Sequence, residues 1–520
     1  MPTNRCLLGT AGILTLGILL AGCSHKKPPV VTPITAKLPP DNLQPPPFQT
    51  PNQKIHAAVE RWRFALMSQS VTSSTPTQLT AMQAIIRSSV AQPSVQSDLK
   101  LLAHYMGVST SQMRSYWEAL QAADLFLESG DDANAVSSVG ACGVAQWMPE
   151  SALRVGLKVN LKESNALSAD ITALQRPAVK AVNAIAGLPG KNPAIDSSSQ
   201  SSSNVRSVDT NSTIAKLQAK RASIDQRFNP ELAIFAQTRY LLSLVRKFPS
   251  TDWLFQAYHG GEGGVTRLLR LYSKEPGASP ASIILGDKHH SRTSFADVYL
   301  NCSPKHHVRA FDYLYSRGDD DRHYWWKILA ATEIIPGLIA QRLAPGSIPP
   351  TLLRLWYGRN EELYRFQGDN MVIQGLNAGV LVPSPCTPTT CQYTPSASHV
   401  GAPPSLRPIA AEALKLIMYR YHAEGGLGLP TVNITTGASA PGPGQSGLGF
   451  QLLFPKDKRD LLVMTYVLER LTDQALIGLG RAVHEGPPHW IVLPCPYYGQ
   501  AISRLVIGQG STTFHEAATN

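Results

Sequence analysis

The sequence lacks the features of metal-binding and nucleic-acid-binding proteins. None of its seven cysteines has zinc-type spacing with histidine partners, so we expect neither a bound metal nor a cofactor. It has no helix-turn-helix, zinc-finger or RNA-recognition motif, so nucleic acid is not an expected partner. Only 16% of the 520 residues are charged, and 40 prolines with 39 glycines indicate long irregular segments. The net charge of +11 suits acidic partners, although a merely solvated basic surface is the alternative.

The N-terminus has one apolar run, and that run is short. Arg5 precedes the apolar stretch Leu7 to Leu20, which is too short to span a bilayer comfortably. Leu20-Ala-Gly-Cys23 follows and resembles the lipobox of bacterial lipoproteins, which implies cleavage before Cys23 and diacylation of its thiol. Because Ser24, not Asp, comes next, we expect a lipid-anchored protein of the outer membrane that faces the periplasm. An uncleaved signal anchor is the alternative.

Cysteine is also scarce. Loss of the signal and acylation of Cys23 would leave five cysteines, an odd number for an oxidising compartment. Cys386 and Cys391 enclose the short loop Thr-Pro-Thr-Thr and are predicted to form a disulfide. Pairing that involves Cys142, Cys302 or Cys495 is left open.

The most informative stretch begins at Glu128. The preceding run Ser115 to Leu127 carries apolar residues at helical spacing, and Gly130 is predicted to end that helix. Glu128 therefore falls in or near the last turn, where the helix dipole and the nearby Asp131 and Asp132 disfavour a further negative charge. This suits a general acid, which must hold its proton near neutral pH. The local pattern taken alone still favours a solvated glutamate.

The stretch resembles the catalytic motif of lytic transglycosylases of bacterial peptidoglycan. The residues that match that motif, in register and without a gap, are Glu128, Ser129, Ala135, Ser137, Gly140, Ala141, Gly143, Gln146, Met148 and Pro149. The resemblance implies that Glu128 is the catalytic acid/base. It also implies that Ser137 binds the substrate's N-acetyl group or orients the acid, and that Gln146 and Met148 line glycan subsites. Asp131 to Ala133 depart from the family pattern, which leaves the shape of the loop open.

Two later blocks resemble the same family. Ala257 to Val265 (AYHGGEGGV) looks like its Ala-Tyr-Asn-Ala-Gly-Pro-Gly motif, and the block that starts at Tyr324 looks like its Tyr-Val-Pro-Lys helix. The resemblance implies that Tyr258 places its hydroxyl in the cleft and that Tyr324 points its hydroxyl at the catalytic glutamate. His259 replaces the family's asparagine. Without the resemblance, these blocks read as a glycine-rich helix connection and an apolar core stripe.

The membrane-bound lytic transglycosylase D group is the most similar subtype. Val155 to Asn160 and Ile224 to Pro230 match a segment that is continuous in that group, and Phe235 to Leu244 matches the helix after it. Residues 161–223 therefore read as an insertion. Its serine-rich run at 197–204 has too little apolar content to fold, so we expect a flexible excursion, either a passive loop or a lid.

The predicted fold is a mainly α lysozyme-like catalytic domain followed by a smaller α+β domain. The expected order is a signal peptide (1–22), a Pro-rich tether (23–52), the catalytic domain (53–345), the α+β domain (350–500) and a tail (501–520). Within the catalytic domain, the segment before Glu128 should be largely helical, and Asp319-Asp-Asp321 should be a solvated turn.

The α+β domain is predicted from periodicity. Its expected elements are a helix that begins at Leu406-Arg-Pro408 and runs through Tyr421, strands at 431–436, 450–454 and 490–493, and a helix at 461–471. This order weakly resembles zinc D-Ala-D-Ala carboxypeptidases. Gly444 and Gln451 stand where that family has metal ligands, and only His489, with Glu485 upstream, remains. We therefore expect a metal-less, wall-binding module.

Together these features predict a lytic transglycosylase that cleaves the MurNAc–GlcNAc β-1,4 bond and leaves 1,6-anhydromuramyl products. Its partners would be peptidoglycan strands and, through Cys23, a membrane. Two alternatives stay open. One is a lysozyme-type hydrolase with Asp131 or Asp132 as second carboxylate. The other is a non-catalytic peptidoglycan-binding lipoprotein. Endo or exo cleavage, stem-peptide preference, protein partners and oligomeric state do not follow from the sequence.

Overall fold

The computed structural model describes residues 75–186, 200–286, 291–317 and 319–341, with parts of 54–66 and of 382–493. The predicted signal peptide, tether and tail lie outside these residues, as do Cys23, Cys495, Gly444 and Glu485. The described chain is mainly helical, with a small sheet in the C-terminal region, as predicted. No described helix combines the length and the apolar character needed to cross a membrane.

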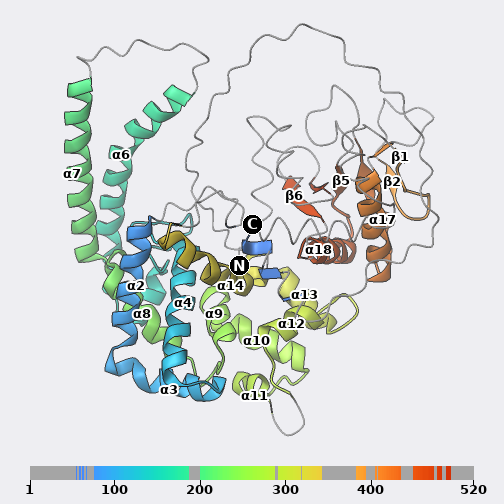
Figure 1. Ribbon diagram of the computed structural model, residues 1–520, viewed down its shortest axis with the longest axis horizontal. Coiled ribbons are helices and arrows are strands. Elements are labelled where there is room, and N and C mark those ends of the chain that lie inside the picture. Colours follow the sequence, from blue (N-terminus) through green and yellow to red (C-terminus); the bar gives the residue numbers. More distant parts are fainter. Residues whose placement is uncertain are drawn as a thin grey trace. The chain divides into compact units, whose positions relative to one another are not determined.

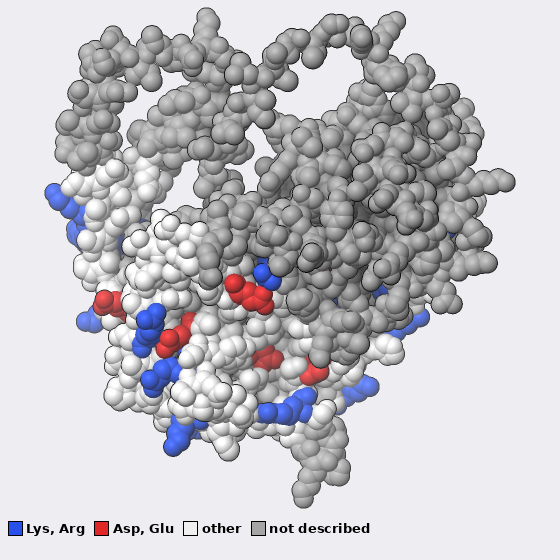
Figure 2. Space-filling view, viewed as in Figure 1, with Lys and Arg blue, Asp and Glu red and all other residues white. Residues whose placement is uncertain are grey.

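The chain divides into two compact units. Unit 1 comprises Met1–His25 and Val71–Arg246, and unit 2 comprises Lys26–Ser70 and Lys247–Asn520. The division at Arg246 falls inside the range 53–345 that was predicted as one catalytic domain. On the face shown in Figure 2, described acidic and basic side chains are interspersed over the surface. The described basic residues on this face are therefore not gathered into one patch.

Unit 1 is built on four helices that pack together (Figure 1): α2 (Pro76–Val90), α3 (Pro93–Met106), α4 (Thr110–Ser129) and α8 (Pro230–Ser243). The predicted helical character of the segment before Glu128 is thus confirmed for residues 76–127. Capping boxes start two of these helices, because Thr75 and Ser109 each accept a hydrogen bond from the N–H of a glutamine three residues on. The fully buried Trp117 donates its indole N–H to Gln121 in the core (2.9 Å).

The predicted insertion contains two long helices, α6 (Leu161–Ala186) and α7 (Gln200–Ile224), which pack side by side (Figure 1). The expectation that the serine-rich run is too poor in apolar residues to fold is therefore wrong for residues 200–204. The serine-rich run lies partly outside the described residues, but α7 begins within it. Leu167 and Ile171 of α6 are buried, so one helix supplies apolar surface that the sequence of the other lacks.

The two ends of this helical pair meet. The backbone N–H of Asn160 donates to Ile224 O (3.1 Å), and that of Gln226 donates to Lys158 O (2.8 Å). The Ser164 hydroxyl donates to Asp225 at 2.8 Å. The chain thus enters and leaves the helical pair at one point within unit 1.

The described helices of unit 2 from residue 251 to 339 are α9 (Thr251–Gly260), α10 (Glu262–Ser273), α11 (Pro280–Leu285), α12 (Phe295–Asn301), α13 (Val308–Ser316) and α14 (Asp319–Ile339). The helix predicted from Tyr324 is confirmed within α14. The solvated turn predicted at 319–321 is wrong, because α14 starts there. Asp321 is also engaged, since it accepts a hydrogen bond from Arg317 at 2.6 Å.

The small sheet has the order β2-β4-β5-β7-β6, with β2 (Gln392–Tyr393), β4 (Thr431–Asn433), β5 (Phe450–Leu453), β7 (His489–Leu493) and β6 (Gly478–Ala482). Strands β1 (Val382–Pro383) and β3 (Ser405–Leu406) form a separate antiparallel pair. Helices α17 (Pro408–Ala423) and α18 (Lys458–Asp473) share a buried apolar core with the five-stranded sheet. The helix predicted at 461–471 and the three predicted strands are confirmed. The helix predicted from Leu406 is confirmed from Pro408 onward, but Leu406 itself lies in β3, and neither β6 nor the two-residue strands were predicted.

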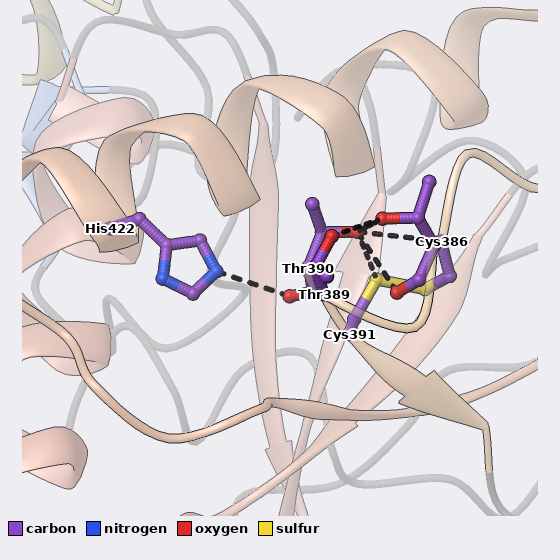
Figure 3. Close-up of a disulfide and its surroundings, with 6 residues drawn as sticks. Cys386, Thr389, Thr390, Cys391 and His422 are labelled. Atoms are coloured by element: carbon purple, nitrogen blue, oxygen red, sulfur yellow. Dashed lines mark hydrogen bonds between the residues drawn. A yellow bond between two sulfur atoms is a disulfide. The ribbon is translucent and has the colours of Figure 1, made fainter.

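The predicted disulfide joins Cys386 and Cys391 (Figure 3). Within its loop, the Thr390 hydroxyl accepts the backbone N–H of Thr387 (2.9 Å). His422 of α17 lies beside the loop, with Nε2 3.2 Å from Thr390 O and Nδ1 3.2 Å from Gly426 O. The loop is thereby attached to the C-terminal end of α17.

Candidate active site

Glu128 lies in the last turn of α4, as predicted. The helix ends at Ser129, and Gly130 adopts a left-handed conformation (φ 62°) while its N–H donates to Phe126 O at 2.9 Å. Phe126 is buried and Glu128 is half-buried. The Ser129 hydroxyl donates to Val144 O (2.8 Å), which attaches the helix end to the following loop. Glu128 is thus a partly accessible acid on a fixed helix end.

Residues 130–148 form a loop that is closed on itself by backbone hydrogen bonds. Cys142 and Trp147 exchange two of them, with N···O distances of 3.1 and 3.0 Å. The N–H of Ser137 donates to Ala141 O at 2.9 Å, and an isolated bridge joins Val136 to Cys142. The loop therefore has a defined backbone shape despite its small and polar residues.

The site residues predicted from the motif occupy distinct places on this loop. The Ser137 hydroxyl accepts the N–H of Ala141 (2.9 Å), and the Gln146 side-chain amide donates to Gly143 O (2.8 Å). Gln146 itself has a positive φ of 46°. Met148 caps the N-terminus of α5 (Pro149–Arg154) and is 38% exposed. Ser137 and Gln146 therefore shape the loop, and their substrate contacts, like that of Met148, stay predictions.

A buried ion pair supports the loop from the segment after α7. Arg227 and Asp225 are paired at 2.7 Å, with side chains that are 1% and 0% exposed. Arg227 also donates to the carbonyl oxygens of Gly140 and Trp147, both at 3.3 Å. No role in the site was predicted for Asp225 or Arg227. The available signal in the sequence was an aspartate and an arginine two residues apart before a helix.

Gly143 lies against the same segment. A Cβ placed there would be 1.8 Å from Arg227 O, and the glycine has a φ of +75°. Only glycine lets the loop approach the backbone at Arg227 so closely. The glycine of the motif is thus explained by packing as well as by conformation.

Asp131, Asp132 and Cys142 of this loop differ in their surroundings. Asp131 is 2% exposed and has a φ of 59°. Asp132 is exposed, and its carboxylate accepts the N–H of Asn134 at 2.8 Å. Cys142 is a buried free thiol, and burial raises its pKa, which disfavours the reactive thiolate.

The predicted tyrosines lie in unit 2. Tyr258 is half-buried near the end of α9, and Gly261 (φ 81°) separates α9 from α10. Tyr324 of α14 is 3% exposed, and its ring stacks on His259 at a centroid distance of 3.8 Å. The structure thus brings Tyr324 together with the neighbour of Tyr258.

Asp321 contacts the stacked His259 through its carboxylate. His259 Nε2 lies 3.5 Å from Asp321 Oδ1, and Arg317 contacts the other oxygen at 2.6 Å. Arg317 also donates to Gly260 O. The histidine that replaces the family's asparagine is therefore an integrated part of the α9–α14 contact.

Two of the positions compared with zinc carboxypeptidases, Gln451 and His489, lie within the described residues. Gln451 of β5 accepts a hydrogen bond from the Asn433 side chain (2.8 Å), and His489 begins β7 and is 8% exposed. Within the described ranges, no cluster of three His, Cys, Asp or Glu residues could hold a metal ion.

The comparisons with known proteins leave the function to be argued from this motif and geometry. No family model, curated protein or solved structure matches the chain.

Proposed function

We propose that this chain is a lytic transglycosylase that cleaves the MurNAc–GlcNAc β-1,4 bond of peptidoglycan and leaves 1,6-anhydromuramyl ends. The helices of unit 1 would belong to a lysozyme-like catalytic fold. Cys23 would carry lipid and hold the enzyme at the outer membrane. The C-terminal segment would be a metal-less wall-binding module.

The observation that carries the proposal is the placement of Glu128. The carboxyl group of Glu128 lies at the end of a well-packed helix, and the next residue, Ser129, is hydrogen-bonded to the loop that contains Gln146. A general acid needs a fixed position and access to its substrate, and the half-buried Glu128 satisfies both needs.

In the proposed reaction, Glu128 first protonates the glycosidic oxygen as the bond to the muramyl C1 breaks. Its carboxylate then removes the proton of the muramyl C6 hydroxyl, whose oxygen bonds to C1. Glu128 donates one proton and then takes one up, so no second carboxylate is needed. The burial of Asp131 and the turn made by Asp132 favour this outcome over a two-carboxylate hydrolase.

Digestion of purified peptidoglycan, followed by mass analysis of the muropeptides, tests the proposal. We expect anhydromuramyl ends, and Glu128→Gln should lower their release by about 10²–10⁴-fold. Glu150→Gln, at an exposed position of α5, is the matched control and should act like the wild type. Reducing ends would instead identify a lysozyme-type hydrolase. A complete lack of release would identify a non-catalytic binder.

The anchor is tested separately. Cys23→Ser should move the protein from the membrane fraction to the soluble fraction without changing the products released from purified peptidoglycan. If this variant stays with the membrane, the lipid anchor is wrong.

A further inference from the structure

Unit 2 contains a small cavity outside the candidate catalytic residues. It is lined by Lys54, by Arg420 of α17 with the following Glu424, and by Tyr466, Arg470 and Asp473 of α18. Its volume is about 60 Å³. One water needs about 10–15 Å³ by this kind of measure, so the cavity can hold a group of a few heavy atoms.

Arg470 lines the cavity with a guanidinium group that its neighbours hold in place. Its guanidinium lies 3.8 Å from the centroid of the Tyr299 ring and 5.1 Å from that of Tyr466. It also donates to Tyr299 O and lies 3.5 Å from Asp473. These contacts hold the planar donor group in one orientation.

The carboxylate of Asp473 is directed to other partners. Its Oδ1 accepts a hydrogen bond from Arg61 at 2.8 Å, and its Oδ2 accepts one from Tyr299 at 2.6 Å. The lining contains three cationic residues, Lys54, Arg420 and Arg470, and two acidic ones, Asp473 and Glu424. The formal charge of the lining residues is therefore +1.

The two arginines of the lining disfavour the charge of Lys54. Burial lowers the pKa of this lysine, and the positive charges of Arg470 and Arg420 lower it further. Burial also lowers the pKa of Arg420. An anion in the cavity would offset both the repulsion and the lost hydration.

We propose that this cavity binds a single carboxylate group of a ligand from outside the chain. One negative charge balances the one net positive charge of the lining. A planar carboxylate fits the donor fork of an arginine, and its few heavy atoms fit the volume. The ligand is a small carboxylic acid or the C-terminal carboxylate of a peptide. This site is independent of the reaction proposed for Glu128.

The test titrates the full chain with acetate in place of chloride at constant ionic strength and follows the thermal unfolding midpoint. Acetate should raise the midpoint saturably, because a ligand that binds the folded state stabilises it. Alanyl-alanine and its C-terminal amide distinguish the two sources of the carboxylate. Stabilisation by the dipeptide but not by its amide indicates a peptide terminus, and stabilisation by acetate alone indicates a small acid.

Two variants and a control locate the effect. Lys54→Gln and Arg420→Gln should each weaken acetate binding about tenfold, the loss expected for one charge-assisted hydrogen bond. Lys456→Gln, at an exposed position, should bind acetate like the wild type. Since Lys54 is half-buried, its variant should fold even if the Arg420 variant does not. The proposal would be overturned if the unfolding midpoint did not rise when acetate replaces chloride. Tighter binding of inorganic phosphate than of acetate, or unchanged acetate binding by Lys54→Gln, would also overturn it.

Discussion

The buried ion pairs Asp225–Arg227 of unit 1 and Arg61–Asp473 of unit 2 organise the chain in different ways. In unit 1, Asp225 and Arg227 are two residues apart and pair at 2.7 Å. In unit 2, Arg61 and Asp473 are separated by 412 residues and pair at 2.8 Å. The first pair holds one loop of the candidate site, whereas the second joins distant parts of the chain in one core.

The long-range pair belongs to a larger set of contacts made by α18. Arg322 of α14 pairs with the buried Glu469, and Arg459 pairs with Asp312 of α13 at 2.7 Å. The C-terminal helix α18 is therefore packed into the same unit as helices that were predicted to belong to the catalytic domain. Whatever it binds, this segment has a structural role in unit 2.

The largest effect is expected from Arg227→Met in unit 1. It leaves the carboxylate of Asp225 buried without its ion-pair partner and removes two donors to loop carbonyls, so we expect a loss of about 5 kcal/mol in unfolding free energy. Denaturant unfolding measures the loss, and hydrogen exchange should show it in residues 130–148. Arg246→Met is the control, because Arg246 pairs with Asp98 while 70% exposed, and it should cost less than about 1 kcal/mol. Equal effects of the two variants would remove the special role of the buried pair.

A smaller loss, about 3 kcal/mol, is expected from Arg61→Met in unit 2. Asp473 keeps Arg470 at 3.5 Å, so its charge stays partly compensated. Hydrogen exchange should localise the loss to unit 2, including α18. Arg63→Met is the matched control, since Arg63 pairs with the half-exposed Glu333, and it should cost less than about 1 kcal/mol. A loss confined to the segment around residue 61 would contradict a shared core.

The loop of unit 1 can also be tested through its glycines. Gly143→Ala forces a Cβ against the Arg227 backbone at a positive φ, and we expect a loss of about 2–3 kcal/mol in unfolding free energy. Gly140→Ala meets a positive φ of 87° but has no atom within 4 Å of the added Cβ. Its cost should be about 1 kcal/mol. If Gly140→Ala costs as much as Gly143→Ala, contact with Arg227 does not explain the glycine.

The disulfide is a local restraint within unit 2. Replacing both Cys386 and Cys391 with Ser should cost about 2 kcal/mol in unfolding free energy, because the closed loop is short. Denaturant unfolding of the wild type with and without a reducing agent should give the same difference. A larger loss than that of Arg61→Met would reverse the ranking of local and long-range restraints.

The smallest effect is the pH dependence of the long-range pair. Burial opposes ionisation of Asp473, but Arg61, His323 and Arg470 together outweigh it and lower its pKa below the ordinary 3.8. Its stabilisation is therefore complete above pH 3.8 and is lost as the pH falls through the lowered pKa of the folded state. Asp473→Asn should flatten the acid side of the stability profile measured by denaturant unfolding.

Asp252, in the same unit, has the opposite effect on how stability depends on pH. Burial raises the pKa of its carboxyl group above 3.8, so its contribution favours the folded state at low pH and is lost as the pH rises through the raised value. Asp252→Asn should therefore steepen the acid side of the profile. The same change of slope from both variants would show that the charges near Asp473 do not outweigh its burial.

Local patterns in the sequence predicted much of the helical structure and part of the site. Gly130 predicted the end of α4 because a left-handed residue there suits glycine, and this placed Glu128 in the last turn. The short spacing of Cys386 and Cys391 predicted their bond. The insertion was misjudged because α7 is poor in apolar residues by itself. Its contacts with α6 involve polar groups, such as Ser168 with Arg221 at 3.0 Å.

The sequence by itself therefore determined the end of α4, the place of Glu128 and the pairing of Cys386 with Cys391, because each depends on residues close together in the chain. Tertiary structure alone decided the direction of Arg227 toward the loop, the pairing of Arg61 with Asp473 and the cation-lined cavity beside Arg470. These features depend on the path of the chain between distant segments. No local periodicity specifies that path, since many distant partners could satisfy the same buried charge.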